Sequence, residues 1–450
     1  MTTRREFLQK SAAAGAWAAA SPAIAASAQS PNDRIRVGLV GMGGRMKWHV
    51  MSLAKLAPQN VEIAAVGDCD QSRLGELEKR YPELAGKKLT LYDDQRKLFD
   101  DKSLDAVSFS TQDHWHALQT IWACQAGKDV YVEKPAAHNI FEGRKMVEAA
   151  RKYGRIVQHG TQCRSSPNIV AGVQKLKEGA IGEVYMARAI SYKLRGDLGK
   201  HNPRPVPPGL NWDAWVGPAK MVDYSSFMHR RWYWIANFAS GDFANQLVHQ
   251  VDIVRWALGL DTHPSKVQAM GGRFPPTTDE DTDLPNTMTY ACQWSGRNVL
   301  TTFENRHWFT PGEAGLGDQY KFVQEQYPCG TIFFGTLGYM IFPDYSSYYT
   351  FLGPKREPGP SAAEPEHSLK GDEHFANWIA AIRSRKPQDL AADIEQGHLS
   401  TAVCHLAKIA WKLGRTVQFD AKTERFVGDA EADALLTRDY RPPYVVPAEV

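Results

Sequence analysis

The chain has 450 residues, of which 43% are hydrophobic and 23% charged, and its 53 basic and 50 acidic side chains leave a formal charge of only +3. This composition is typical of a folded globular protein, and the length favours two domains. No run of lysine and arginine could follow a phosphate backbone, so we expect no nucleic acid partner. The six cysteines lack the spacing of zinc ligands, so we expect no metal centre.

Residues 1–28 differ in kind from the rest of the chain. The pair Arg4-Arg5 precedes an Ala- and Gly-rich stretch over 11–20, and small residues follow up to Ala28. This order resembles a twin-arginine (Tat) signal, which exports proteins already folded. We expect a periplasmic or extracellular protein, with a frayed N-terminal helix as the alternative. No later stretch has about 18 uninterrupted apolar residues, so no membrane association is expected after signal removal.

Residues 33–162 have the pattern of a nucleotide-binding Rossmann domain. A β-prone run over 35–40 leads into Gly41-Met42-Gly43-Gly44-Arg45-Met46 and then into a predicted helix. Gly41 would make the tight turn, Gly43 would let the backbone approach a pyrophosphate, and the helix N-terminus would bind its charge. Met46 replaces the third glycine of the G-x-G-x-x-G pattern, so the loop needs support from the strands that follow.

The second predicted strand supplies that support. It covers 61–67 and ends at Asp68, about 25 residues beyond the glycines, where a carboxylate accepts hydrogen bonds from the adenosine ribose. Asp70 is the alternative ribose ligand. A carboxylate repels a 2′-phosphate, which favours NAD, while Arg45 and Arg73 nearby leave NADP open as the second choice.

Strands and helices alternate through the remainder of this half. β-prone runs at 106–110, 130–132 and 156–158 are separated by helical patterns, which predicts a doubly wound parallel sheet. In such a fold the ligand groups lie on loops at the carboxyl ends of the strands. These loops are 41–46, 68–70, 111–116, 133–135 and 161–167.

Residues 163–438 predict a second, α+β domain. β-prone runs separated by turns dominate it, with helical patterns over 374–384 and 394–413, which indicates a large, open, mostly antiparallel sheet. The β-prone runs are 182–192, 266–271, 287–294, 298–304, 331–334 and 339–342. A Pro-rich tail over 439–450 is expected to lie along the surface.

The segment between residues 193 and 242 combines aromatic rings with hydrogen-bonding cations. This mixture suits a sugar, because its C–H faces stack on rings and its hydroxyls need partners. We interpret Lys193, Arg231 and Trp234 as substrate contacts. Trp212 and Trp215 are interpreted as packing at the seam between the domains.

Several separate motifs occur in the order found in one known family. Asp113-His114-Trp115-His116 precedes Glu133-Lys134-Pro135, and Trp212 to Pro218 and His249-Gln250-Val251-Asp252 follow. Over nearly the whole chain beyond the signal, the sequence resembles the glucose-fructose oxidoreductase and inositol dehydrogenase (Gfo/Idh/MocA) family. The resemblance implies NAD(P), hydride transfer with a sugar or sugar-like polyol, and a dimer or tetramer. Because an exported protein cannot easily exchange its cofactor outside the cytoplasm, we expect the nucleotide to be tightly bound.

The resemblance also assigns catalytic roles. The family's lysine lies between nicotinamide and substrate, which assigns that place to Lys134, where a cation stabilises the developing alkoxide. The family's Asp-x-x-x-His-x-x-Asp helix corresponds to Asn245, His249 and Asp252, and Asn245 shares one helical face with His249. His249 suits a general base. Asn245 cannot take a proton, which leaves Lys134 and His249 as the acid–base pair.

The remaining site residues follow from these loops and motifs. Asp252 would either orient the imidazole of His249 or pair with Arg255. His249 and Asp252 join Lys193, Arg231 and Trp234 as predicted substrate contacts. The predicted cofactor contacts are Gly41, Met42, Gly43, Gly44, Arg45, Met46, Asp68, Ser110, Thr111, His114, His116, Glu133, Lys134, Gln162 and Arg164.

Two other functions stay open at this level. Some members of the family cleave glycosides through transient oxidation of a ring hydroxyl, and Lys134, His249 and NAD would serve that reaction equally. A non-catalytic sugar-binding or assembly protein is the third possibility, because Asn245 has replaced an acid and a fold alone does not guarantee chemistry.

Overall fold

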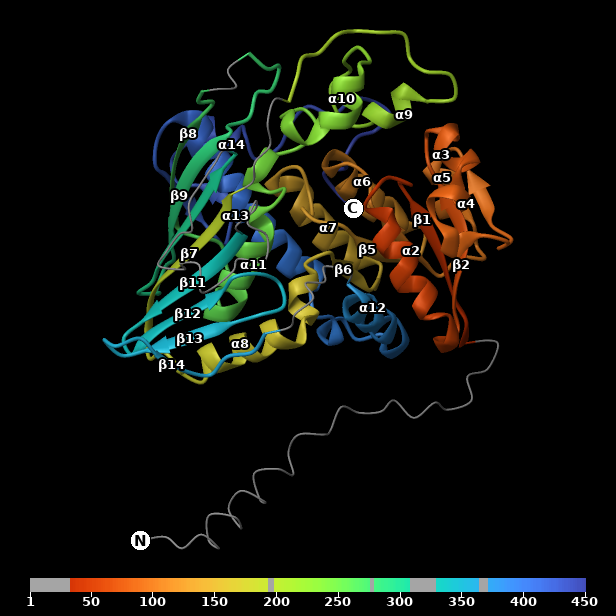
Figure 1. The fold of residues 1–450 in the computed structure, drawn as a ribbon. Helices are drawn as coiled ribbons and strands as arrows, with labels where there is room; N and C mark the ends of the chain where they lie inside the picture. The colour runs from red at the N-terminus through yellow and green to blue at the C-terminus, as the bar shows by residue number, and fades with distance from the viewer. Residues whose placement is uncertain (1–32, 193–197, 276–278, 308–328, 364–370) are drawn as a thin grey trace, which may run out of the picture.

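The protein is built on two β-sheets that lie side by side with helices between them (Figure 1). The computed structural model describes residues 33–192, 198–275, 279–307, 329–363 and 371–450. The predicted fold class is confirmed, because a parallel Rossmann sheet is followed by a mixed, mostly antiparallel sheet. The proposed signal and Lys193 lie outside the described residues and stay predictions.

The first sheet has six parallel strands in the order β3-β2-β1-β4-β5-β6. Every residue of β4 and β5 is buried, as expected of parallel strands with helices on both faces. The strand order reverses between β1 and β4, which places a ligand crevice at their carboxyl ends. The strands are β1 (Ile35–Val40), β2 (Val61–Gly67), β3 (Thr90–Tyr92), β4 (Ala106–Phe109), β5 (Asp129–Val132) and β6 (Val157–His159).

The helices of this unit begin where the sequence provides a cap. The Asn139 side chain accepts from the backbone N–H of Glu142 at the start of α7, and Asp94 does the same for α5 through Arg96. The helices are α2 (Met46–Lys55), α3 (Gln71–Gly75), α4 (Leu77–Arg80), α5 (Gln95–Asp100), α6 (Asp113–Gln125) and α7 (Ile140–Lys152).

The second sheet has ten strands in the order β14-β13-β12-β11-β7-β10-β9-β8-β15-β16. The β7–β10 pair is parallel and the other described pairings are antiparallel. Burial alternates along β8 and β9, so one face of the sheet forms a core. The strands are β7 (Val184–Tyr192), β8 (Lys266–Gly272), β9 (Thr287–Gln293), β10 (Leu300–Arg306), β11 (Cys329–Gly335), β12 (Gly338–Phe342), β13 (Tyr349–Leu352), β14 (Glu357–Pro358), β15 (Val417–Asp420) and β16 (Arg425–Phe426).

Helices α8 (Pro167–Lys177), α11 (Leu247–Leu258) and α13 (Ile394–Leu413) cover the inner face of this sheet. Val251 of α11 and Leu406 of α13 join Tyr290 and Phe303 of the sheet in one buried cluster. The short helices α9 (Trp212–Val216) and α10 (Ser226–Arg231) lie outside this layer, whereas Ala432 of the short helix α14 (Ala430–Asp433) belongs to the same buried cluster. No helix among the described residues is both long and apolar enough to span a bilayer.

Two late segments of the chain return to the Rossmann sheet. Helix α12 (Asp372–Ser384) packs on α2, and its Phe375 and Trp378 join the core cluster that contains β1 and β2. Tyr444 and Val446 of the tail are only 6% and 4% exposed and belong to the cluster under α6. The expectation of a tail lying along the surface is therefore wrong at these two residues, whose side chains fill the core beside Trp115.

Candidate active site

The turn after β1 depends on a glycine in the left-handed conformation. Gly41 has a φ of +87°, and a Cβ there would lie 2.7 Å from Cγ2 of Thr111 and 3.0 Å from the backbone nitrogen of Thr111. Only glycine meets both constraints. No atom lies within 4 Å of a Cβ built on Gly44. The side chains of Met42 and Met46 are buried in the core, so the loop offers backbone groups at the N-terminus of α2, as pyrophosphate binding requires.

Asp68 at the end of β2 holds this loop in place. Its Oδ2 accepts from the backbone N–H of Met42 at 2.7 Å, and its Oδ1 accepts from that of Asp70 at 2.9 Å. Burial raises the pKa of Asp68 against the opposing effects of Arg73, 3.6 Å away, and of these N–H groups. Asp68 thus anchors the glycine loop in addition to bordering the ligand crevice.

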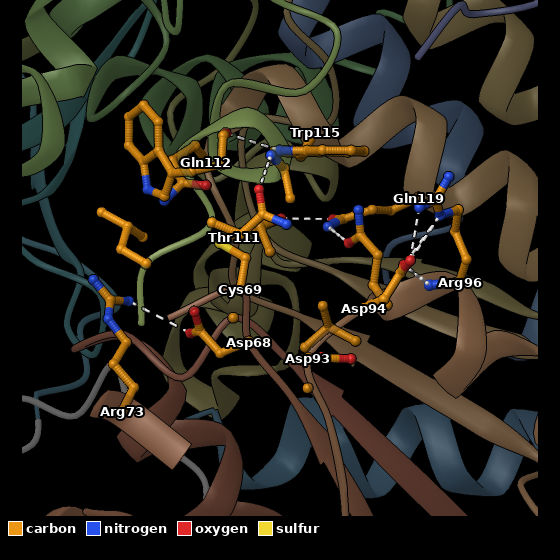
Figure 2. Close-up of a pocket in the computed structure, with 18 of the residues that line it drawn as sticks. Asp68, Cys69, Arg73, Asp93, Asp94, Arg96, Thr111, Gln112, Trp115 and Gln119 are labelled. Carbon is orange, nitrogen blue, oxygen red and sulfur yellow. Dashed lines mark hydrogen bonds and ion pairs between the residues drawn. The ribbon is translucent and has the colours of Figure 1, made fainter. Parts of the chain in front are cut away.

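A cavity of about 490 Å³ opens beside Asp68 at the carboxyl ends of β1, β2 and β4 (Figure 2). Its wall contains Gly41, Asp68, Ser110 and Thr111 of the predicted cofactor contacts, together with Arg73. A volume of this size is in the range of small-molecule sites. The carboxylate and the open glycine turn fit the adenosine and pyrophosphate portions of a dinucleotide.

The far wall of the cavity comes from later parts of the chain. The backbone N–H of Gln71 donates to the carbonyl of Gly209 at 2.9 Å, and that of Asn211 donates to the carbonyl of Cys69 at 2.9 Å. Tyr444 also lines the cavity, and its hydroxyl donates to Asp213 at 3.1 Å. The cavity is therefore enclosed between the Rossmann sheet, the 209–215 segment and the tail.

Glu133 is the centre of a buried charge cluster. Its Oε1 accepts from Nε of Arg45 at 2.8 Å and from Nε2 of Gln162 at 3.0 Å, and lies 3.1 Å from Nε2 of His49. Burial opposes ionisation, but Arg45, His49 and Lys134 outweigh it and hold the pKa of Glu133 well below its ordinary value. Arg45 and Gln162, both predicted to touch the cofactor, are thus engaged with Glu133.

The structure brings Lys134 and Asn245 together across the two units. The Nζ of Lys134 donates to the backbone carbonyl of Asn245 at 2.5 Å and to its Oδ1 at 3.1 Å. Lys134 follows β5, whereas Asn245 lies two residues before α11. The amine therefore stands at the junction of the Rossmann sheet and the second unit.

His249 lies on the first turn of α11 and is 5% exposed. Burial lowers the pKa of His249 well below its ordinary value, and the positive charge of Lys134 adds to the effect. Its Nδ1 is buried without a hydrogen-bond partner among the residues that the structure describes. The imidazole is thus uncharged at neutral pH and keeps a lone pair that could accept a proton, but its lowered pKa makes it a weaker base than an exposed histidine.

Asp252 has neither of its expected partners. It forms a bidentate ion pair with Arg164, at 2.7 and 2.9 Å, and accepts from Oγ of Ser400 at 2.7 Å. Arg255 instead donates to Ser400 at 2.8 Å. The pairing of Asp252 with Arg255 is therefore wrong, and Asp252 and Arg164 neutralise each other in the core, where both are under 10% exposed.

The two predicted histidines of α6 have backbone partners. The ring nitrogens of His114 lie 3.2 and 3.3 Å from the carbonyls of Trp215 and Phe238, and burial lowers its pKa to about 3. Nδ1 of His116 lies 2.7 Å from the carbonyl of Pro135. His114 thus ties α6 to the second unit, and His116 ties it to the loop that carries Lys134.

In the segment between residues 193 and 242, Trp234 is more buried than a ring on which a sugar could stack. Trp234 is 1% exposed and packs against His307, with ring centroids 4.7 Å apart. Arg231, at the end of α10, is exposed. Trp212 and Trp215 stack on each other at 4.5 Å, and the carbonyl of Trp215 accepts from Nε1 of Trp115. These contacts place Trp212 and Trp215 at the seam between the units.

Two ionisable residues near Lys134 were missed from the sequence. Asp113, the first residue of α6, is buried, which raises its pKa to about 7 against the opposing charges of Lys134 and Lys408. Burial lowers the pKa of Lys408 to about 8, and its Nζ donates to Oγ of Ser240 at 2.8 Å. Asp113 belonged to a recognised motif, whereas Lys408 lies in an amphipathic helix that gives no local signal.

Another ionisable cluster lies away from this site. Oε1 of Glu424 is 2.6 Å from Arg144, 2.7 Å from His263 and 2.9 Å from His398. The two histidines and the carboxylate have the atoms for a metal site. The guanidinium of Arg144 stands at the same oxygen, however, and its charge opposes a cation there.

A Rossmann sheet with a cavity at the carboxyl ends of its strands, followed by a second α/β unit, is typical of two-domain dinucleotide-binding proteins. Two family descriptions match the chain: "Oxidoreductase family, NAD-binding Rossmann fold" over residues 35–161, and "Oxidoreductase family, C-terminal alpha/beta domain" over 364–446. These two segments of the chain thus match the Gfo/Idh/MocA oxidoreductase family.

Several known proteins are similar to this chain. An inositol 2-dehydrogenase of Acidothermus cellulolyticus is 27% identical over 240 residues, which are 53% of this chain and 57% of that protein. The chain thus matches little more than half the length of this relative. The WlbA dehydrogenase of Bordetella pertussis, solved with NADH and UDP-GlcNAcA, has a TM-score of 0.62 at 18% identity, covering 86% of this chain and 99% of that one. A levoglucosan dehydrogenase solved with NADH and levoglucosan has a TM-score of 0.61 at 17% identity, covering 88% and 99%. Both solved structures have the same fold as this chain.

Proposed function

We propose that the protein transfers hydride between a tightly bound NAD and the CH–OH group of a sugar or sugar-like polyol. The observation that carries the proposal is the contact of Lys134 with Asn245, which sets an amine at the junction of the units, next in the chain to the Glu133 that binds Arg45 of the glycine loop. The relatives named for inositol and levoglucosan support a polyhydroxylated substrate.

Lys134 and His249 would act on different atoms of the substrate's CH–OH group. When bound, NAD⁺ supplies the acceptor for the hydride that leaves the carbinol carbon. Nζ of Lys134 would stabilise the charge that develops on the oxygen, and the uncharged His249 would accept the hydroxyl proton. The alcohol becomes a carbonyl, having lost one hydride and one proton.

The cavity supports NAD and its retention. Asp68 stands where the ribose of NAD would bind, and a 2′-phosphate would meet its negative charge. The 209–215 segment and Tyr444 enclose the same cavity, which would slow the release of a bound nucleotide. Slow release suits a protein that is loaded with cofactor and folded before export, as the Arg4-Arg5 leader indicates.

The test begins with mass spectrometry of the nucleotide carried by the purified protein. A panel of sugars and polyols is then screened for absorbance change at the reduced-nicotinamide band, with Lys134→Met as the active-site variant. Lys177→Met, on the exposed side of α8, is the matched control.

We expect bound NAD, reduction by at least one polyol, and a loss of about 100-fold or more in Lys134→Met only. An unchanged rate in Lys134→Met would refute the proposal. Release of phenol from an aryl glycoside without net reduction would instead assign the glycosidase reaction.

A further inference from the structure

Asn245, which faces Lys134 from the second unit, carries a side-chain amide. Asn245 accepts from Nζ of Lys134 through both its backbone carbonyl and its Oδ1. A side-chain amide has one accepting and one donating end, so it can face an amine only in one of its two orientations. Something must therefore hold the amide of Asn245 with its oxygen toward Lys134.

A buried carboxylate stands at the other end of that amide. Nδ2 of Asn245 donates to Oδ1 of Asp242 at 3.3 Å, and Oδ2 of Asp242 lies 2.8 Å from Nε2 of His307. Asp242 and His307 are only 1% and 2% exposed. The backbone N–H of Asn245 donates to the carbonyl of Gly241 at 2.8 Å, so one turn of chain presents both side chains to the same side.

We propose that Asp242 is a positioning residue for Lys134: with His307 it fixes the amide of Asn245 so that Oδ1 faces the amine. This inference rests on the proposed role of Lys134 in hydride transfer. The flipped amide would set its oxygen against the carboxylate and its NH₂ group against the amine, which loses both hydrogen bonds at once. The carboxylate that the sequence lacks at position 245 thus acts from position 242, through one intervening side chain.

The same arrangement gives a role to Trp234. Its ring packs edge-on against His307 at 4.7 Å and is itself 1% exposed. The indole therefore supports the histidine that binds Asp242. The influence of Trp234 on the site would pass through His307 rather than through contact with a sugar.

The test exchanges the two side chains. In Asp242→Asn the carboxylate is lost, and we expect the single-turnover rate of reduction of bound NAD to fall about tenfold, with the KM for the polyol changed less than about twofold. In the double variant Asp242→Asn, Asn245→Asp, the carboxylate introduced at position 245 accepts from Lys134 directly, and the amide introduced at position 242 bridges it to His307. We expect this variant to recover to within about threefold of wild type.

If Asp242 only stabilised the fold, moving its carboxylate to position 245 would not restore the rate of reduction. If the double variant is as slow as or slower than Asp242→Asn, or if Asp242→Asn is as fast as wild type, the inference is overturned. Asn245→Asp alone sets two carboxylates side by side and should be slower than the double variant, which a coupling analysis of the four proteins would show.

A second readout does not need turnover. The rate at which an amine-reactive reagent labels Lys134 is followed by mass spectrometry on the nucleotide-bearing protein. We expect labelling about three- to tenfold faster in Asp242→Asn, because the oriented acceptor and a nearby negative charge are lost, and near wild type in the double variant. Asp105→Asn, exposed just before β4 and so at the opposite end of the Rossmann strands from Lys134, is the charge control and should not change the labelling rate.

The two readouts separate the two proposals. If no polyol reduces the bound nucleotide but labelling responds as expected, the proposed function fails and the positioning of Lys134 stands. If turnover is normal and labelling is the same in all variants, the positioning inference fails and the function stands.

Discussion

Replacing Gly41 by alanine should disrupt the nucleotide loop for two separate reasons. The φ of +87° costs an L-residue about 1–2 kcal/mol. The added Cβ would lie 3.0 Å from the backbone nitrogen of Thr111 and 3.1 Å from the carbonyl carbon of Ser110, and these backbone atoms cannot rotate away as a side chain could. Such overpacking costs about 1–3 kcal/mol, so we expect a total loss of about 2–5 kcal/mol.

The matched control is Gly44→Ala, three residues further along the same loop. A Cβ on Gly44 meets no atom within 4 Å, so its stability should stay within about 1 kcal/mol of wild type. Denaturant titration would measure both variants, and mass spectrometry would measure the nucleotide that each retains. If Gly41→Ala unfolded at the midpoint of Gly44→Ala and kept its nucleotide, the argument from the left-handed turn would be refuted.

Three further predictions concern other parts of the structure. Tyr444→Ala opens the nucleotide cavity and should speed the release of NAD about fivefold or more in a stopped-flow displacement assay, whereas the exposed neighbour Val445→Ala should not. Burial lowers the pKa of His114 to about 3, so below about pH 6.5 the unfolded chain binds a proton at this side chain that the folded protein does not. The contribution of His114 to stability is complete above that pH and falls by about 2 kcal/mol on reaching pH 5. Unfolding of His114→Gln across this range should show a shallower slope, and an equal slope would contradict this reasoning. Glu424→Gln weakens three contacts at one oxygen and should lower the free energy of unfolding, measured with denaturant, by about 2–3 kcal/mol. The control is Glu431→Gln, whose carboxylate pairs with Arg415 at the surface, and it should lose less than about 0.5 kcal/mol. Equal losses in the two variants would refute this explanation.

The predictable parts of the molecule are those encoded by local patterns. The runs over 35–40, 61–67 and 130–132 are strands because continuous apolar segments between helices suit a sheet buried on both faces. The β-prone run over 287–294 likewise predicted β9. Gly41 was predicted as a tight turn, and its positive φ agrees.

The missed features depend on residues far apart in the chain. Asp252 was expected either to orient His249 or to pair with Arg255, both on its own helix, but Arg164 approaches from another element and binds it instead. The burial of Tyr444 is set by Trp115 and Asp213, and no property of the tail indicates either partner. Similarly, Asp242 acts through Asn245, so its importance is visible only in the hydrogen bonds.

The return of α12 and the tail to the first sheet has a consequence for biosynthesis. The Rossmann strands leave the ribosome first, yet Phe375, Trp378 and Tyr444, which complete their cores, are made hundreds of residues later. Such distant contacts form late, because the intervening loop must close before they stabilise anything. One wall of the nucleotide cavity is thus synthesised early and the residue that completes it, Tyr444, at the end, and a chain truncated before Tyr444 should release its cofactor faster than the full chain.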